Sequence, residues 1–168
     1  MGLIGRLLAW SFVHAPFAAE LWSQSRRRRP SPLFVTPMKP LSWIRLGLVT
    51  TGGVHHTDQP PFRRKGESAR GDGTWRRLDL QRLRGSFAIT HDWYDKEDAE
   101  WDMNLVLPAD RLREFAEEGI IGILHPVAAG LMGHVEGEEE MRVEFQTAPE
   151  IARLFREEGV DAVLLVPA

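Results

Sequence analysis

The sequence contains no cysteine among its 168 residues. This absence excludes a disulfide framework, a thiolate zinc site and a cysteine nucleophile within the chain. The sequence also lacks any run of about 20 apolar residues, the length that a helix needs to cross a bilayer. We therefore expect a cytoplasmic protein whose thiol chemistry, if it has any, is supplied by another segment or subunit.

Neither half of the sequence is balanced in charge, although the net charge is only −3. Residues 1–90 carry 15 basic and 5 acidic side chains, whereas residues 91–168 carry 6 basic and 19 acidic ones. The basic half has no interleaved aromatic platform and no recognisable nucleic-acid-binding module, so we expect no nucleic-acid partner. Opposite charges on the two halves favour contact within one fold or between subunits, which includes a homo-oligomer.

Three segments follow from the pattern along the chain. Residues 1–29 predict an amphipathic helical arm with a basic run, residues 30–40 a proline-rich connector, and residues 41–168 one α/β domain. The apolar positions of the arm recur at spacings of three and four, which is one face of a helix. Either this face packs on the body or on a second subunit, or residues 3–29 make peripheral contact with an anionic membrane surface.

Short apolar runs and turn signals define the expected elements of the domain. Strands are predicted at residues 44–50, 87–90, 131–135 and 162–166, and helices at residues 108–118 and 147–159. The second helix begins with a capping box from Thr147 to Glu150, and the polar stretch 54–84 is expected to be a long loop. The last strand is apolar without alternation, which is typical of a strand buried on both faces. The pattern predicts a doubly wound, mostly parallel sheet of Rossmann or flavodoxin type.

Two polar clusters come directly after predicted strands, one after Thr50 and the other after Thr90. Since ligands of open parallel sheets bind beyond the carboxyl ends of the strands, we expect both clusters in one crevice. Imidazoles carry protons near neutral pH, and carboxylates fix their tautomers. The candidate catalytic residues are therefore His55, His91 and Asp95. The candidate substrate-binding residues are Thr51, Gly53, His56, Asp58, Gln59, Trp93 and Tyr94.

The same side chains permit two other interpretations. Nitrogen and oxygen ligands suited to zinc or non-haem iron are present in His55, His56, His91 and Asp95. Alternatively, the histidines hold the loops by hydrogen bonds and the carboxylates cap turns. We expect no resident metal, and we expect that folding requires none, because these candidate ligands lie on loops outside the core. No nucleotide cofactor is expected, because no helix opens directly behind the glycine pair of the first cluster.

Six short segments share an order and spacing with one known family. They are LVTTGGVH at 48–55, DQPPF at 58–62, GDG at 71–73, HDWYD at 91–95, LPADRL at 107–112 and DAVLLVP at 161–167. Together, from residue 41 to residue 168, they resemble the selenoprotein B subunits of glycine, sarcosine, betaine and D-proline reductases. The resemblance implies a cytoplasmic subunit of a multisubunit reductase that cleaves a small amino acid or its N-methylated derivative.

In that family the strand resembling residues 163–167 leads into a selenocysteine or cysteine, which the resemblance places just after Ala168. A parallel strand buried on both faces also needs a covering helix or crossover after it. We therefore expect a domain that is incomplete at its C-terminus, through a selenocysteine codon read as a stop or through shortening of the chain. The alternative is a complete protein that ends on its last strand.

Three functions remain open at this point. The first is a subunit of a selenol- or thiol-dependent reductase that lacks its redox residue, holds no cofactor of its own, and has other reductase subunits and a small amino-acid-like substrate as partners. The second is a metal-dependent enzyme that uses the His/Asp cluster. The third is a non-catalytic binding or assembly subunit.

Overall fold

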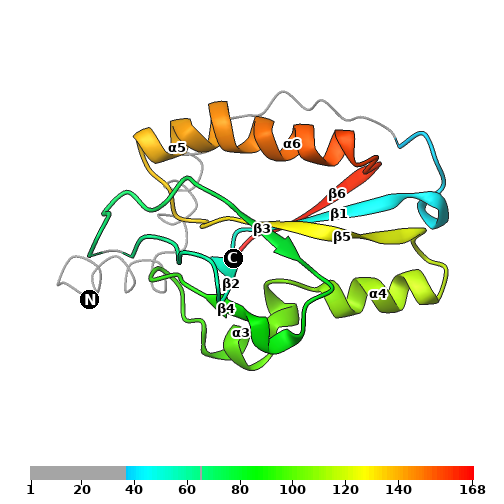
Figure 1. Ribbon diagram of the computed structural model, residues 1–168, viewed down its shortest axis with the longest axis horizontal. Helices are drawn as coiled ribbons and strands as arrows, with labels where there is room; N and C mark the ends of the chain where they lie inside the picture. The colour runs from blue at the N-terminus through cyan, green and yellow to red at the C-terminus, as the bar shows by residue number, and fades with distance from the viewer. Residues whose placement is uncertain (1–36, 65) are drawn as a thin grey trace, which may run out of the picture. The chain divides into compact units, whose positions relative to one another are not determined.

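A four-stranded sheet lies at the centre of the computed structural model, which describes residues 37–64 and 66–168 (Figure 1). Its strands, in spatial order, are β3 (Arg76–Asp79), β5 (Ile123–Gly130), β1 (Arg45–Thr50) and β6 (Ala162–Val166). Strand β1 pairs in parallel with β5 and β6, whereas β3 pairs antiparallel with β5. The predicted α/β class is confirmed, with a mixed sheet. The predicted arm, residues 1–29, and most of the connector lie outside the described residues.

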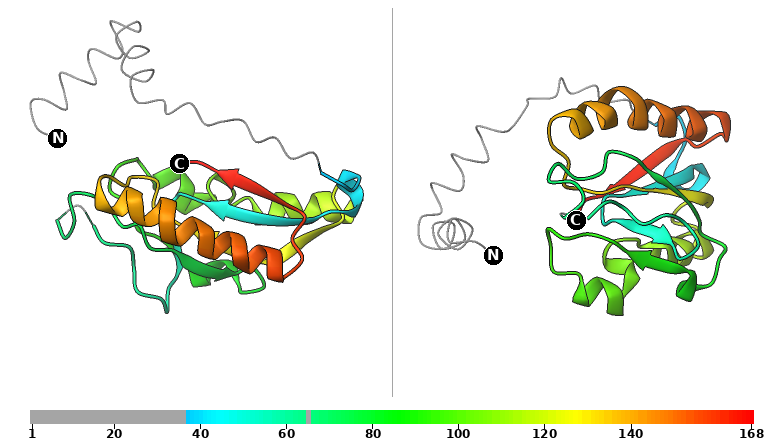
Figure 2. Two further views of the ribbon diagram at one scale, coloured as in Figure 1. Left: turned by 90° about the horizontal axis from the view of Figure 1, so that it is seen from above. Right: turned by 60° about the vertical axis from the view of Figure 1, so that its left-hand side comes forward.

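Helices cover both faces of this sheet (Figures 1 and 2). On one face lies α4 (Ala109–Glu117), which connects β1 and the segments after it to β5. The other face carries a continuous helical stretch made of α5 (Glu138–Arg142), a π-helical turn (Val143–Thr147) and α6 (Ala148–Glu157). Buried Ile151 and Phe155 of α6 pack against Ala129 and Leu131. The apolar stripe of each helix thus faces the sheet, as the spacing of three and four predicts.

A second, smaller layer carries the segments that form the site. It consists of β2 (Val54–His56) paired antiparallel with β4 (Phe87–Ile89), followed by α3 (Glu97–Trp101). Single helical turns at Leu41–Trp43, Arg84–Ser86 and Met103–Leu105 complete the described elements. An added Cβ at Gly130 would lie 2.1 Å from the Val54 carbonyl oxygen, so β2 crosses β5 at backbone distance.

Buried charges hold the long segment between β2 and β3. The Asp72 carboxylate accepts hydrogen bonds from the backbone N–H groups of Arg63 and Thr74, 3.0 Å each. Glu139, at the start of α5, accepts from the N–H of Gly73 at 2.8 Å and pairs with the guanidinium of Arg63 at 2.8 Å. These bonds satisfy two buried carboxylates and keep the segment ordered without a core of its own.

The strand predicted at residues 131–135 is wrong, because the strand occupies Ile123–Gly130 instead. Pro126 interrupts the apolar run, and a proline has no N–H for a sheet ladder. The chain accommodates it in a bulge: the partners Leu46↔Leu124 and Leu48↔Ala128 leave two residues of β5 out of step with β1. The long loop predicted at residues 54–84 is also wrong in part, since it contains β2 and β3.

Two further expectations about the last segments are wrong. The Thr147 side chain does not cap α6; its hydroxyl donates to the Gly73 carbonyl oxygen at 2.6 Å, and the helix runs through Thr147 from α5. Strand β6 is not buried on both faces. It is an edge strand, bonded to β1 alone within the described chain, and its Leu165 side chain is 69% exposed.

The core prediction concerns Leu48, which lies in the centre of β1 and is fully buried. We expect Leu48→Ala to lower the free energy of unfolding by about 2–5 kcal/mol, because the neighbours only partly fill the cavity that is left. Leu83→Ala is the matched control, since this leucine is 85% exposed and its loss should cost less than about 0.5 kcal/mol. Denaturant unfolding of both variants measures the two values. Equal losses would contradict the placement of β1 at the centre of the core.

Candidate functional site

Three loops meet at the carboxyl ends of the parallel strands. The Thr51 N–H donates to the Val166 carbonyl oxygen at 3.0 Å, and the Gly53 N–H donates to the Leu131 carbonyl oxygen at 2.8 Å. The Thr90 N–H donates to the Gly53 carbonyl oxygen at 2.9 Å. The segments after β1, β4 and β5 therefore converge beside the end of β6, at the sheet edge where the polar clusters were predicted to meet.

Gly53 makes this convergence possible. Its φ of +72° is a left-handed conformation that favours glycine, and an added Cβ would lie 2.3 Å from the Thr90 carbonyl oxygen. The same added atom would lie 3.1 Å from the Cβ of His91. Gly53 was predicted to bind substrate. In the structure its backbone lies at this junction and sets the position of the residues after β4.

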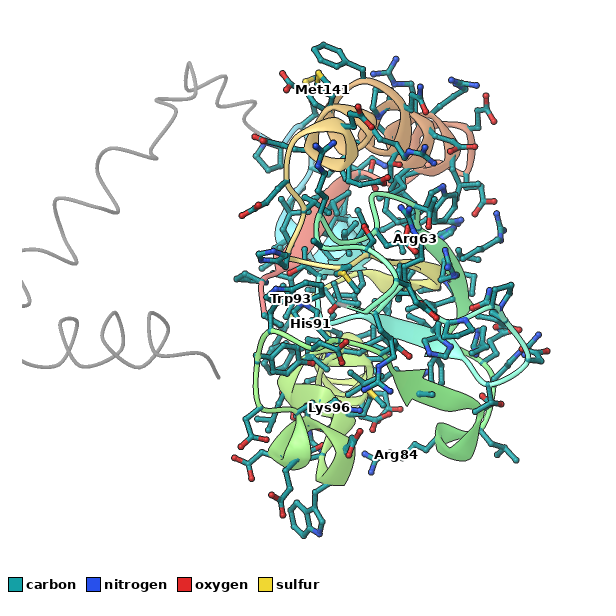
Figure 3. The ribbon with its side chains drawn as sticks, turned by 90° about the vertical axis from the view of Figure 1, so that its left-hand side faces the viewer. Arg63, Arg84, His91, Trp93, Lys96 and Met141 are labelled. Atoms are coloured by element: carbon teal, nitrogen blue, oxygen red, sulfur yellow. The ribbon has the colours of Figure 1, made fainter. Side chains whose placement is uncertain are left out.

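An aromatic cluster borders the junction (Figure 3). The ring of His91 lies 4.6 Å from that of Tyr94 and 5.9 Å from that of Trp93, measured between centroids. The Tyr94 hydroxyl donates to the Gly52 carbonyl oxygen at 2.9 Å, and burial raises its pKa. Trp93 in turn stacks on His134 at 4.3 Å and 12°. The structure thus brings together three residues predicted for the site and adds a fourth.

His91 is buried and neutral. Burial lowers the pKa of its imidazole, and the neighbouring His134 lowers it further, against an opposite effect of Asp92. The Trp93 backbone N–H donates to Nδ1 at 3.2 Å, which places the proton of the neutral ring on Nε2. Nε2 is buried and has no hydrogen-bond partner among the described residues. A buried N–H without a partner costs free energy, so an acceptor that reached this donor would stabilise the site.

His55 orients the site instead of facing it. Its Nδ1 lies 2.8 Å from the His56 carbonyl oxygen and therefore carries the proton, while Nε2 accepts from the Thr90 hydroxyl at 2.9 Å. Both nitrogens are engaged, so the ring holds Thr90 in place next to His91. Thr51 contributes its hydroxyl at the end of β6, where Oγ1 accepts from the Ala168 N–H at 3.1 Å.

Three predicted substrate-binding residues make their contacts toward β3. The Nε2 atom of His56 accepts from the Asp79 N–H at 2.8 Å, and the amide of Gln59 joins the His56 N–H to the Arg77 carbonyl oxygen. Asp58 is exposed and pairs with Arg82 at 2.9 Å, which lowers the pKa of its carboxyl. These contacts fasten β2 to β3, and they do not place the three residues in the aromatic cluster.

Asp95, predicted as catalytic, is exposed at the start of α3. Its carboxylate accepts from the Glu97 N–H at 3.1 Å rather than contacting either histidine, which is the turn-capping role that the sequence left open. In the described part of the chain no three His, Asp or Glu side chains are grouped so that they could hold a metal ion. The alternative ligand set of His55, His56, His91 and Asp95 is therefore not assembled there.

Sequence reasoning missed His134. It follows β5 at the same edge as the predicted clusters, but the misplaced strand at residues 131–135 put it inside an element rather than after one. The signal that could have identified His134 is its position in the sequence. It lies a few residues after the carboxyl end of a parallel strand, where polar residues are expected to line the crevice.

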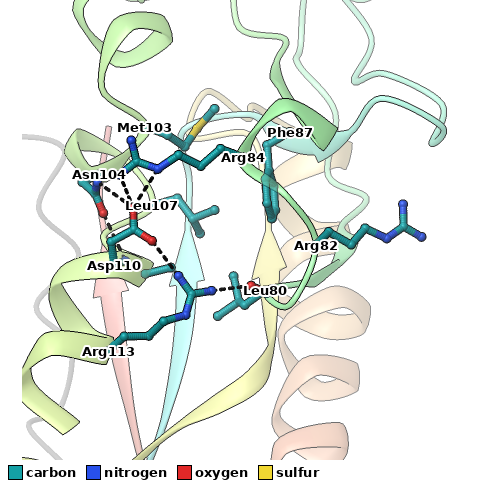
Figure 4. Close-up of a pocket in the computed structure, with 10 residues that line it drawn as sticks. Leu80, Arg82, Arg84, Phe87, Met103, Asn104, Leu107, Asp110 and Arg113 are labelled. Carbon is teal, nitrogen blue, oxygen red and sulfur yellow. Dashed lines mark hydrogen bonds and ion pairs between the residues drawn. The ribbon is translucent and has the colours of Figure 1, made fainter. Parts of the chain in front are cut away.

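Two cavities are lined in part by residues of β4, and only one of them is also lined by residues of the junction. One, of about 290 Å³, is lined by Pro61, Arg64, Ile89, Thr90, His91 and Lys96. The other lies between the turn before β4 and the start of α4 (Figure 4). There Asp110 pairs with both Arg84 and Arg113, so these charged side chains bind one another. Only the first cavity contains a buried donor without a partner within the described residues.

The fold is that of an α/β protein with a mixed sheet, and polar and aromatic side chains gather at the carboxyl edge of its parallel strands. Residues 8–168 match the model of the glycine/sarcosine/betaine reductase selenoprotein B family. The chain belongs to this family. The family membership predicted from the six short segments is thereby confirmed.

Several relatives carry related names. The chain is 35% identical over 136 residues to the D-proline reductase subunit gamma of Acetoanaerobium sticklandii, which covers 81% of this chain and 53% of that protein. It is 33% identical over 130 residues to the betaine reductase complex component B subunit beta of Peptoclostridium acidaminophilum, covering 77% of this chain and 29% of that protein. The chain thus spans about half the length of the first relative and less than a third of the second. No solved structure matches the chain. Among the described helices, none has the length and apolar character to cross a membrane.

Gly53 provides a direct test of the junction. We expect Gly53→Ala to destabilise the fold by about 1–3 kcal/mol, because the methyl group meets the Thr90 carbonyl and the left-handed φ is strained for alanine. Gly85→Ala is the matched control, since an added Cβ there meets no heavy atom within 4 Å. Thermal unfolding compares the two variants. A Gly53→Ala protein as stable as the control would show that the loops do not approach as described.

The pH dependence of stability tests the burial of His91. Its lowered pKa means that the unfolded chain takes up the proton first, so stability is complete above about pH 6.5 and falls as the pH drops below that value. His56, whose pKa burial also lowers, contributes with the same sign. His91→Gln should therefore reduce the loss of unfolding free energy between about pH 7.5 and pH 5.5. An unchanged pH slope in this variant would place His91 in solvent.

Proposed function

We propose that the chain is part of a reductase subunit that acts on a small amino acid or its N-methylated derivative. In this proposal the substrate binds at the carboxyl edge of the sheet, beside the end of β6. The support is the convergence of the loops after β1, β4 and β5. It brings the ring of His91, which carries a buried Nε2–H without a partner among the described residues, next to Trp93 and Tyr94. The names of the relatives, which are components of D-proline, betaine and glycine reductases, supply the substrate class.

The proposed redox group is a selenocysteine or cysteine from outside the 168 residues, which contain no cysteine. Its selenolate or thiolate attacks the carbon that carries the amine nitrogen, in the substrate or in an intermediate on a partner subunit, so a carbon–selenium or carbon–sulfur bond forms as the carbon–nitrogen bond breaks and the amine departs with a proton. A dithiol then reduces this adduct, which releases the deaminated product, restores the selenol or thiol and leaves the dithiol as a disulfide. In this proposal the residues of this chain bind the substrate and orient it. His91 presents a neutral N–H donor, Trp93 and Tyr94 form an aromatic wall, and Thr51 fixes the backbone at the end of β6.

We also propose that the sheet is the start of a doubly wound domain of flavodoxin type in a cytoplasmic protein. The order β5-β1-β6 and the helices on both faces support this. After β1 the chain forms β5 on one side of β1, and it then crosses over to form β6 on the other side. The switch point of such a sheet falls between β1 and β6. The candidate site lies at that end of both strands.

A role in assembly is the second candidate function, and one observation favours it. An apolar groove of about 220 Å³ lies beside β6 and is lined by residues of α6 and by the exposed side chains of Val163 and Leu165. An apolar surface of this kind is typical of contacts with another protein surface. Assembly with other reductase subunits is compatible with catalysis, whereas a purely assembling chain would show no dependence of turnover on His91.

Purification of the native complex through a tag on this chain tests the proposal. We expect the other reductase subunits to co-purify and the complex to show dithiol-dependent cleavage of glycine, sarcosine, betaine or D-proline. His91→Leu, which removes the N–H donor, should lower turnover by about tenfold or more, the size of one lost hydrogen bond to a charged group in the transition state, with the complex still assembled.

His125→Leu is the control. This histidine is equally buried but bonds to the Val127 carbonyl oxygen and to Glu158, remote from the junction. The thermal unfolding of this variant shows whether it folds, and its turnover per folded complex should match the wild type. A complex without reductase activity would overturn the proposed function, and activity insensitive to His91→Leu would leave only the assembly role.

A further inference from the structure

The cavity beside His91 has the size of a small ligand. Its volume is about 290 Å³, at the lower end of the range of small-molecule sites. Its wall comes from two segments far apart in the sequence, the stretch after β2 with Pro61 and Arg64 and the stretch from Ile89 to Lys96. Figure 3 looks onto the edge of the sheet where His91 and Lys96 lie one above the other.

The wall of this cavity is cationic. Arg64 and Lys96 are basic, and none of the six lining residues is acidic. Arg64 donates to Asp92 from Nε and Nη2, at 3.2 and 3.0 Å, and a guanidinium has further N–H groups on Nη1. Lys96 pairs with Glu100 at 2.6 Å and reaches the Ile89 carbonyl oxygen at 3.3 Å, which engages two of its three N–H groups. Each cation therefore has donor capacity left for a ligand.

His91 adds a neutral donor to these two charges. Its Nε2–H is buried without a partner among residues 37–64 and 66–168, which is a cost that a bound acceptor would remove. Thr90, whose hydroxyl bonds to His55, also lines the cavity. Pro61 and Ile89 contribute apolar residues to the same lining. A ligand that satisfies the wall has an anionic, oxygen-bearing end and a short apolar body.

We propose that this cavity binds the carboxylate of a small molecule through His91, Lys96 and Arg64. A carboxylate offers two planar acceptor oxygens, which suit one N–H donor together with a neighbouring cation. The identification of that carboxylate as the one on an amino-acid substrate rests on the proposed function. The binding of a carboxylate as such does not, because it requires neither a redox group nor a partner subunit.

Titration of the full chain with sodium acetate at constant ionic strength tests this site. The probe is the ¹H–¹⁵N correlation of the histidine rings, which reports the Nε2–H of His91. We expect a saturable shift with acetate and none with acetamide, which has the same shape without the charge. Equal responses to both compounds, or a response to inorganic phosphate alone, would overturn the assignment of a carboxylate.

Variants then assign the residues. Lys96→Met should weaken acetate binding about tenfold, the size of one charge-assisted hydrogen bond. Lys39→Met is the matched control, because this lysine also pairs with a carboxylate, that of Asp161 at 2.7 Å, and does not line the cavity. His91→Leu should weaken binding as Lys96→Met does, whereas His91→Gln, which keeps an N–H donor, should retain most of it. Thermal unfolding confirms that each variant is folded.

The outcomes separate this site from the proposed function. A chain that binds acetate through Lys96 but yields no active complex would retain the carboxylate site and lose the reductase role. An active complex whose apparent KM for its substrate is unchanged by Lys96→Met would retain the reductase role and lose the site. Failure of Lys96→Met to weaken acetate binding relative to Lys39→Met would also reject it.

Discussion

The backbone of Gly53 is the constraint on which the site depends. Its N–H donates to Leu131 in the segment after β5, and its carbonyl oxygen accepts from Thr90 after β4. One residue therefore ties the four-stranded sheet to the two-stranded layer, and its left-handed φ lets it make both bonds. The Cβ of any other residue at this position would meet Thr90 and His91. The segment after β4 can therefore approach the end of β1 this closely only because residue 53 is a glycine.

This junction explains how a buried histidine keeps a free donor. His91 follows Thr90 directly, and Thr90 is held by its backbone bond to Gly53 and its side-chain bond to His55. The ring then lies edge-on to Trp93 and tilted against Tyr94, and its burial lowers its pKa. The free energy that holds the unpartnered Nε2–H in place comes from these surrounding contacts. Such local cost, sustained by a rigid frame, is typical of binding sites.

The elements with strong local sequence signals were predicted correctly. The features that depend on pairing between segments far apart in the sequence were not. Helix α4 and strand β1 follow from apolar spacing, and the convergence of the loops after Thr50 and Thr90 follows from the geometry of parallel sheets. The bulge at Pro126 was not predictable, because it depends on β1 pairing across it. That error concealed His134, and the exposure of β6 depends on which strand lies at the edge of the sheet. Asp95 was predicted to be catalytic and Asp58 to bind substrate because each lies in a polar cluster after a strand, whereas their partners, Glu97 and Arg82, are visible only in three dimensions.

The adjacent histidines of β2 show why residue type alone does not assign a role. Successive side chains of a strand point to opposite faces, so His55 and His56 cannot serve the same site. His55 turns toward Thr90 and fixes the loop that carries His91, while His56 turns toward β3 and accepts from Asp79. Both rings are buried, and neither faces a ligand directly. The two adjacent histidines thus make structural contacts on either side of a strand. Each of His56 and His91 has one buried ring nitrogen without a partner among the described residues, but only His91, in the segment after β4, lines the cavity.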